Sequence, residues 1–93
     1  MTAKIRITNE KEHYDLQTIL FELGCEWYTT GKKYFGYYKL YTYYIIDISD
    51  NIMTWRGYSN KPNFEYISFN TTEYKKFIRK YKLKKLNESN KDK

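Results

Sequence analysis

The sequence of 93 residues is poor in the residues that build covalent and metal-bound sites. Its one cysteine, Cys25, excludes a disulfide within the chain, and its one histidine, His13, excludes a histidine-rich metal site. The four glycines are scattered, so there is no glycine-rich phosphate loop. The longest uncharged apolar run, residues 40–46, is far shorter than the roughly 20 residues that a membrane span needs. We therefore expect no metal, no cofactor and no membrane segment.

Catalytic groupings are lacking as well. A Cys–His nucleophilic pair needs its side chains in hydrogen-bond contact. The helix expected between His13 and Cys25 separates them by roughly 18 Å, at about 1.5 Å per residue. Residues 47–51 lack the glycine and the distal glutamate of a calcium loop, and they are typical of a turn. The sequence thus predicts a protein that is not an enzyme and has no catalytic residue.

The charge of the chain is placed unevenly. The net charge is +6, but residues 1–73 hold eight cations against nine anions, whereas residues 74–93 hold nine cations against two anions. Hydrophobic residues make up 41% of the chain, which is enough for one domain with a small core. Residues 1–6 lack the apolar stretch of a secretory signal, so we expect a soluble, cytoplasmic protein.

Tyrosine is the other excess, with twelve tyrosines against five phenylalanines. An AT-rich genome favours the codons of both residues, and it also favours lysine over arginine, which number 14 and 3. Codon bias accounts for part of this composition but not for the preference of tyrosine over phenylalanine. Tyrosine suits surfaces that are half apolar and half wet, as on sheet faces and at interfaces.

Helix signals lie near both ends of the chain. Asn9 and Glu12 form a capping box, and Gly24 suits a helix C-cap, which predicts a helix over residues 10–23. Its apolar stripe has helical spacing and consists of Leu16, Ile19, Leu20 and Leu23.

The second helix repeats these signals. Asn70 and Glu73 form a capping box, and Phe69 with Tyr74 forms a hydrophobic staple. The pattern predicts a helix that ends near Lys82. Its apolar stripe consists of Tyr74, Phe77, Ile78 and Tyr81.

Strand patterns fill the rest of the chain, so the element order is β-α-β-β-β-β-α. This order predicts a small two-layer α+β domain over residues 1–86. In it an antiparallel β-sheet carries the N-terminal helix, and a basic amphipathic helix ends the domain. Residues 87–93 have almost nothing to bury, so we expect a disordered tail. The predicted strands are residues 4–7, 26–29, 34–48, 52–58 and 64–69.

The strand 34–48 is either straight or bent near Gly36. Its alternation predicts an apolar face, which includes Tyr44 and Ile46, and an open tyrosine face. Such a face has the ingredients of a base-stacking platform, with a lysine for phosphate. Packing in cross-strand pairs, or at a homodimer interface, is the other interpretation. The open face would hold Tyr37, Lys39, Tyr41 and Tyr43.

The C-terminal helix puts its cations opposite its apolar stripe. They form either an ordinary solvated face or a surface that binds phosphate or an acidic partner. Membrane-surface binding is disfavoured, because the helix needs its apolar stripe for the core. The candidate binding residues are Lys75, Lys76, Arg79, Lys80 and Lys82.

Helix 10–23 has two aromatic side chains, Tyr14 and Phe21, that lie off its apolar stripe. They predict contact with the loops, an exposed pair that contacts another protein, or burial under the C-terminal segment.

Residues 4–27 combine Ile5-Arg6-Ile7-Thr8-Asn9-Glu10-Lys11-Glu12-His13 with Leu20-Phe21-Glu22-Leu23-Gly24-Cys25-Glu26-Trp27. This N-terminus resembles small proteins of bacteriophages and mobile elements, in which a strand enters a short helix that ends in Leu-Phe-x-Leu-Gly-x-x-Trp. The shared residues are structural and transfer no catalytic role. The resemblance implies an accessory protein that binds and disables a host defence component, for example in an anti-CRISPR-like way.

Two functional hypotheses follow. The first is a non-enzymatic phage-type inhibitor that blocks a host defence protein or nucleoprotein complex in the host cytoplasm. The second is a module that binds nucleic acid, or that sequesters a phosphorylated small molecule as a homo-oligomer, through tyrosine stacking and the basic helix. A DNA mimic is disfavoured because such inhibitors are strongly acidic, whereas this chain is basic.

Overall fold

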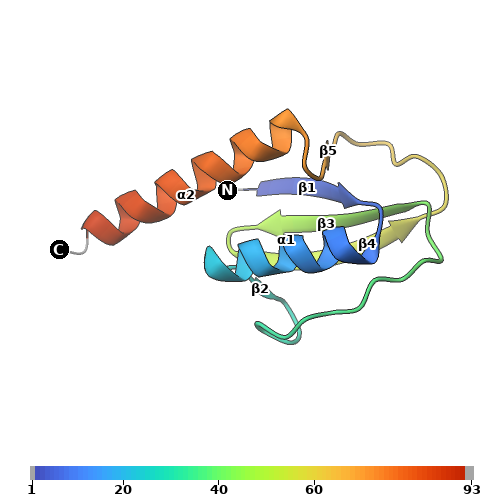
Figure 1. Cartoon of the computed structure of the whole chain (residues 1–93), viewed down its shortest axis with the longest axis horizontal. Coiled ribbons are helices and arrows are strands. Elements are labelled where there is room, and N and C mark those ends of the chain that lie inside the picture. Colours follow the sequence, from blue (N-terminus) through green and yellow to red (C-terminus); the bar gives the residue numbers. More distant parts are fainter. Residues whose placement is uncertain (1, 92–93) are drawn as a thin grey trace.

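The computed structural model describes the backbone of residues 2–91 and the side chains of residues 2–87. Its element order is β-α-β-β-β-β-α, as the sequence predicts, and it forms a compact α+β fold (Figure 1). The elements are β1 (Thr2–Ile7), α1 (Glu10–Glu22), β2 (Glu26–Trp27), β3 (Tyr43–Ser49), β4 (Ile52–Tyr58), β5 (Ile67–Ser68) and α2 (Thr72–Lys91).

The sheet is mixed, with the strand order β2-β4-β3-β1-β5. The three central strands pair antiparallel as expected, but β2 runs parallel to β4 and β5 runs parallel to β1. The expectation of a wholly antiparallel sheet is therefore wrong at both edges. The cause is connectivity. Both edge strands follow crossover connections, α1 before β2 and residues 59–66 before β5, and a crossover returns a strand in the parallel sense.

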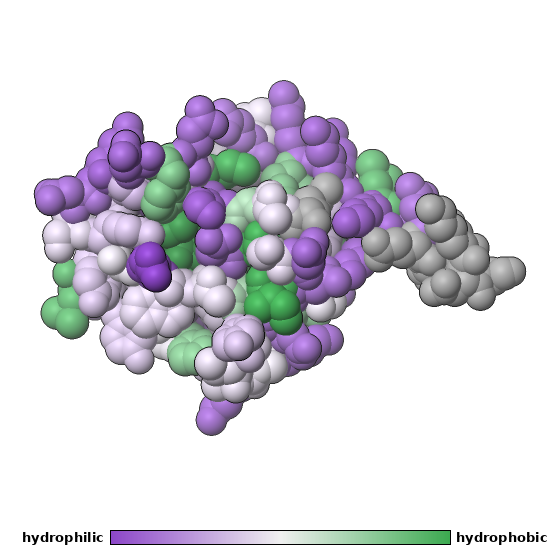
Figure 2. Space-filling model, turned by 180° about the vertical axis from the view of Figure 1, so that it is seen from behind, coloured by the Kyte–Doolittle hydropathy of each residue, from purple (hydrophilic) through white to green (hydrophobic). Residues whose placement is uncertain are grey.

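The core lies between α1 and the sheet face on which it packs, which we call the inner face. Alternate residues of β3 point into it, and Tyr44, Ile46 and Ile48 are buried as predicted. From α1, Leu16 and Leu20 meet them. The other sheet face, the outer face, is largely polar, and seen from behind it is pale and purple with only small hydrophobic patches (Figure 2).

The ends of α1 form as its local sequence predicts. The side chain of Asn9 accepts a hydrogen bond from the Glu12 amide at 2.8 Å. Glu12 in turn accepts from the amide of Thr8 at 2.8 Å, one residue earlier than in the usual capping box. Gly24 has a φ of 91°, a left-handed conformation that glycine adopts without strain.

The long strand predicted over residues 34–48 is shorter in the structure, because β3 begins only at Tyr43. Residues before it leave the sheet plane and lie over the inner face. Tyr38 stacks on Trp55 with ring centroids 5.2 Å apart, and the ring of Tyr41 lies where a side chain at Gly57 would stand. Glycine at position 57 opens the space that this ring fills.

Replacing Gly57 by alanine is therefore expected to lower the free energy of unfolding by about 1–3 kcal/mol, because the new methyl group would overlap the ring of Tyr41. Urea unfolding followed by tryptophan fluorescence measures this. Gly36→Ala is the matched control, since a methyl group there meets nothing within 4 Å. Equal stability of the two variants would show that Tyr41 does not occupy this space.

Helix α2 differs from its prediction at both ends. Its N-cap is Thr71, whose hydroxyl accepts from the Tyr74 amide at 3.3 Å. Asn70 instead takes a left-handed turn with φ 65°, so the capping box predicted there is wrong. The staple is present, with the Phe69 and Tyr74 rings 4.8 Å apart.

The predicted end of α2 near Lys82 is wrong, because the helix continues to Lys91. No glycine or proline follows Lys82 to stop it. Lys85 also adds a contact one turn after Tyr81, with its ammonium 5.7 Å from the centroid of the Tyr81 ring. Helical backbone thus covers most of the expected tail at 87–93, of which residues 92–93 lie outside the described residues.

The last strand is also shorter than the predicted 64–69. Only Ile67 and Ser68 pair with β1. Phe64 instead lies near the outer face, with the Lys4 ammonium 5.5 Å from its ring centroid.

Candidate binding surface

The most basic surface of the molecule is on α2. The five cations singled out from the sequence are all exposed, and so is Lys84. Among side chains 2–87, the ion pairs join Lys4 to Asp47 and Lys11 to Asp15, and neither involves these residues. Their charge is therefore not neutralised within the described part of the chain. The five are Lys75, Lys76, Arg79, Lys80 and Lys82.

These cations divide between two flanks of the helix. Lys75, Arg79 and Lys82, spaced at i, i+4 and i+7, follow one flank, which faces α1. Lys76 and Lys80, spaced at i and i+4, follow the flank beyond it. An anionic partner can therefore approach α2 from more than one side.

The buried stripe of α2 fixes the direction of these flanks. Tyr74, Ile78 and Tyr81 are buried in the common core. The Tyr81 hydroxyl donates to the side chain of Asn51 and lies 3.1 Å from the sulfur of Cys25. Beyond Tyr81 the helix extends away from the sheet (Figure 1). The basic surface thus lies on a helix whose first part is packed on the core, up to Tyr81, and whose last part extends away from the sheet.

The open tyrosine face is not assembled as predicted. Tyr37 and Tyr41 lie over the inner face, where Tyr37 contacts Tyr44 with ring centroids 5.1 Å apart. Tyr43 alone points to the outer face. The chain leaves strand geometry before Tyr43, so alternation no longer places these side chains together. A platform built from Tyr37, Tyr41 and Tyr43 is therefore excluded by the structure.

On the outer face, Tyr43 is covered by a cation. The guanidinium of Arg6 lies 4.3 Å from its ring centroid, and Tyr66 meets it edge-on at 6.2 Å. Beside them, Lys4 pairs with Asp47 at 2.8 Å. Arg6 and Lys4 of the outer face therefore have partners within the described residues, whereas the exposed cations of α2 have no acidic partner there.

Tyr14 and Phe21 have different environments. Phe21 is buried, so its prediction as an exposed contact residue is wrong. It meets a loop, as one of the alternatives predicts, because the ring of Tyr34 packs against it edge-on at 4.9 Å. Tyr14 is 56% exposed and stacks on Tyr34 at 4.7 Å. The sequence did not single out Tyr34, because its position over α1 depends on a loop that local patterns do not place.

His13 and Cys25 belong to separate environments. His13 is enclosed by the rings of Trp27, Tyr37 and Tyr44. Cys25 is hydrogen-bonded to Tyr81, and burial raises the pKa of its thiol. A thiol with a raised pKa stays protonated and is a weak nucleophile. Over the described residues, no cluster of acidic, histidine or cysteine side chains has the arrangement of a metal site.

Within the described part of the chain, no helix is long and apolar enough to cross a bilayer. Comparison of the chain with protein-family models, with curated proteins and with solved structures found no significant match.

Proposed function

We propose that the protein is a non-enzymatic binding protein that blocks an acidic surface of a host defence protein or nucleoprotein complex. The observation that supports this most is the basic surface of α2, whose six exposed cations have no acidic partner among side chains 2–87. Exposed charge of one sign steers association with an oppositely charged partner. The part of the proposal that concerns host defence comes from the resemblance of residues 4–27 to phage accessory proteins.

Charge reversal of the five cations of α2 tests this proposal. The protein is expressed in bacteria that carry a set of phage defence systems, and phage plating is measured with and without it. We expect the parent protein to restore plating against one system. The variant in which Lys75, Lys76, Arg79, Lys80 and Lys82 are all glutamate should lose about tenfold or more of this effect.

The control for this experiment checks that the variant is folded. The five side chains are exposed, so the variant should retain the circular dichroism spectrum of the parent, and its free energy of unfolding should change by no more than about 0.5 kcal/mol per substitution. A folded variant that restores plating as well as the parent would contradict the role of α2. Failure against every defence system would contradict the defence function.

Direct binding of nucleic acid is the second candidate, and the same uncompensated cations favour it. The loss of the three-tyrosine platform leaves phosphate contacts as its main support. Purification at low salt, with absorbance read at 260 and 280 nm, distinguishes the candidates. Excess absorbance at 260 nm that high salt removes would favour nucleic acid, because phosphate contacts release counterions. A clean protein spectrum would favour a protein target.

A further inference from the structure

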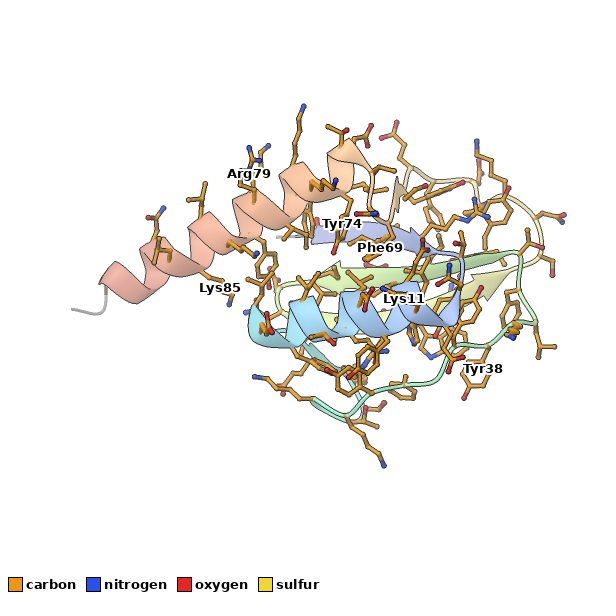
Figure 3. All side chains as sticks on the ribbon, viewed as in Figure 1. Lys11, Tyr38, Phe69, Tyr74, Arg79 and Lys85 are labelled. Carbon is orange, nitrogen blue, oxygen red and sulfur yellow. The ribbon has the colours of Figure 1, made fainter. Side chains whose placement is uncertain are left out.

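A furrow runs between α1 and α2. It consists of two hollows of about 580 and 420 Å³ that share the side chains of Ile19 and Tyr74. Figure 3 shows Phe69 and Tyr74 between the two helices, with Lys11 on α1 beside them. Because the hollows share these side chains, they adjoin each other, and we call the two together the furrow.

The two ends of the furrow differ in chemistry. The end near the start of both helices is mixed, because polar side chains such as Asn9 and Thr18 lie there beside the rings of Phe69 and Tyr74. The other end has an apolar floor bordered by cations of α2. That floor is made by Ile19, Tyr74, Ile78, Leu83 and Leu86, and the bordering cations are Lys75, Arg79 and Lys82.

Leu83 and Leu86 give α2 more apolar surface than its core packing uses. They are 54% and 58% exposed, although they lie in the same helix as the buried Tyr81. They follow the flank of Lys75, Arg79 and Lys82, not the buried stripe. Leucine side chains beside cations, on a concave surface, are suited to an amphipathic partner.

Tyr74 lies where the two hollows meet and keeps an unpaired polar group beneath them. Its side chain is only 5% exposed and lines both hollows. Its hydroxyl has no hydrogen-bond partner among the described residues. A buried hydroxyl without a partner is costly, and an occupant that displaces the side chains above it and bonds to it would remove this cost.

The charges around the furrow indicate the sign of the charge that an occupant carries. The two carboxylates of α1 that line it are already engaged, Asp15 by Lys11 at 2.7 Å and Glu12 by Thr8 at 2.8 Å. The cations of α2 have no such partner among side chains 2–87. Counted by charge, the lining holds four cations, Lys11 and the three of α2, against two carboxylates. The α2 end of the furrow, which has no carboxylate in its lining, therefore favours an anionic occupant.

We infer that this furrow binds an acidic amphipathic helix of the partner protein, with leucine-type side chains on Leu83 and Leu86 and carboxylates on Lys75, Arg79 and Lys82. This inference rests on the proposed binding function and specifies the partner's chemistry. A groove between two helices accepts the apolar edge of a third. A second copy of the chain is disfavoured by the repulsion between basic α2 helices, and a flat bilayer does not fill a concave floor.

Two sets of variants with the same charge change on the same helix test the inference. In the furrow set, Lys75, Arg79 and Lys82 become glutamate. In the control set, Lys76, Lys80 and Lys84, which do not line the furrow, become glutamate. A third variant, Leu83→Ser with Leu86→Ser, removes apolar contact without changing charge.

The ligand is a fluorescent synthetic peptide of about 18 residues, or five helical turns, with leucine at i, i+3, i+4 and i+7, glutamate at the positions that flank these leucines and alanine elsewhere, so that repulsion between glutamates does not unfold it. Fluorescence anisotropy measures its binding to each full-length variant. We expect the furrow set and the leucine variant each to weaken binding about tenfold or more, and the control set about threefold or less. A peptide with lysine in place of glutamate should not bind.

Each other outcome overturns the inference. Equal weakening by the furrow and control sets would show general attraction to α2, which leaves the proposed function intact but removes the furrow from it. An unchanged affinity of the leucine variant would exclude the apolar floor. Binding to phosphatidylglycerol vesicles in place of the peptide would indicate a lipid surface, and dimerisation that the leucine variant abolishes would indicate a second copy.

Discussion

Replacing Gln17 by leucine is expected to lower the free energy of unfolding by about 3 kcal/mol, although leucine is nearly as large and more hydrophobic. Gln17 lies on α1 and is 1% exposed. Its amide oxygen accepts from the Trp27 indole at 2.9 Å and from the Phe35 amide at 2.7 Å. Its amide nitrogen donates to the carbonyls of His13 and Phe35. Leucine would leave the Trp27 indole and the backbone groups of Phe35 without this partner, at about 1–3 kcal/mol for each one that stays buried. The His13 carbonyl keeps its bond within the helix.

Loss of the Gln17 side chain should also loosen one segment of the chain more than the rest. It joins α1 to Trp27 and Phe35, and so holds residues 28–42 over the helix. Hydrogen exchange in that segment should therefore accelerate more than in β3 and β4. Urea unfolding gives the overall loss of stability.

Thr18→Val is the matched control for this prediction. It removes hydroxyl contacts to Tyr14 and Tyr34 on the exposed side of the same helix, which should cost about 0.5 kcal/mol or less. A leucine variant as stable as the control, with unchanged exchange, would show that the buried amide does not anchor the segment.

Gln17 also shows why part of the fold is not readable from the sequence. The ends of α1 are set by neighbours within four residues, so Asn9 and Gly24 predict them correctly. A glutamine in a helix is usually exposed, and nothing near Gln17 in sequence indicates that it is buried. Its burial depends on Phe35, eighteen residues later, which lies over a second face of α1.

The same distinction applies to the binding surface. The cations of α2 are exposed as predicted, because the amphipathic pattern of one helix determines which side is buried. The tyrosine platform failed because it required the strand geometry to begin before Tyr43. The furrow could not be predicted from local patterns, because its sides come from two helices that are distant in the chain. Leu83 lines a hollow only because Ile19 of α1 lies near it.

The stability of the protein is expected to fall between pH 6.5 and pH 4, before most carboxylates are protonated, because of His13. This side chain is 1% exposed, and burial lowers its pKa from 6.5 to about 4. Above pH 6.5 the imidazole is neutral in both the folded and the unfolded chain, and stability is at its full value. Between the two pKa values only the unfolded chain binds the proton, so stability falls by about 1.4 kcal/mol per pH unit.

The most informative interval is pH 7.5 to 5, in which carboxylates of ordinary pKa stay ionised. Over it we expect a loss of about 2 kcal/mol, measured by urea unfolding at closely spaced pH values. His13→Phe keeps an aromatic ring among Trp27, Tyr37 and Tyr44 and removes the titrating group. Its stability should be nearly constant over the same interval. If the variant shows the parent's slope, the proton binds elsewhere; if neither changes, the buried ring of His13 accepts a proton as readily as it does in the unfolded chain.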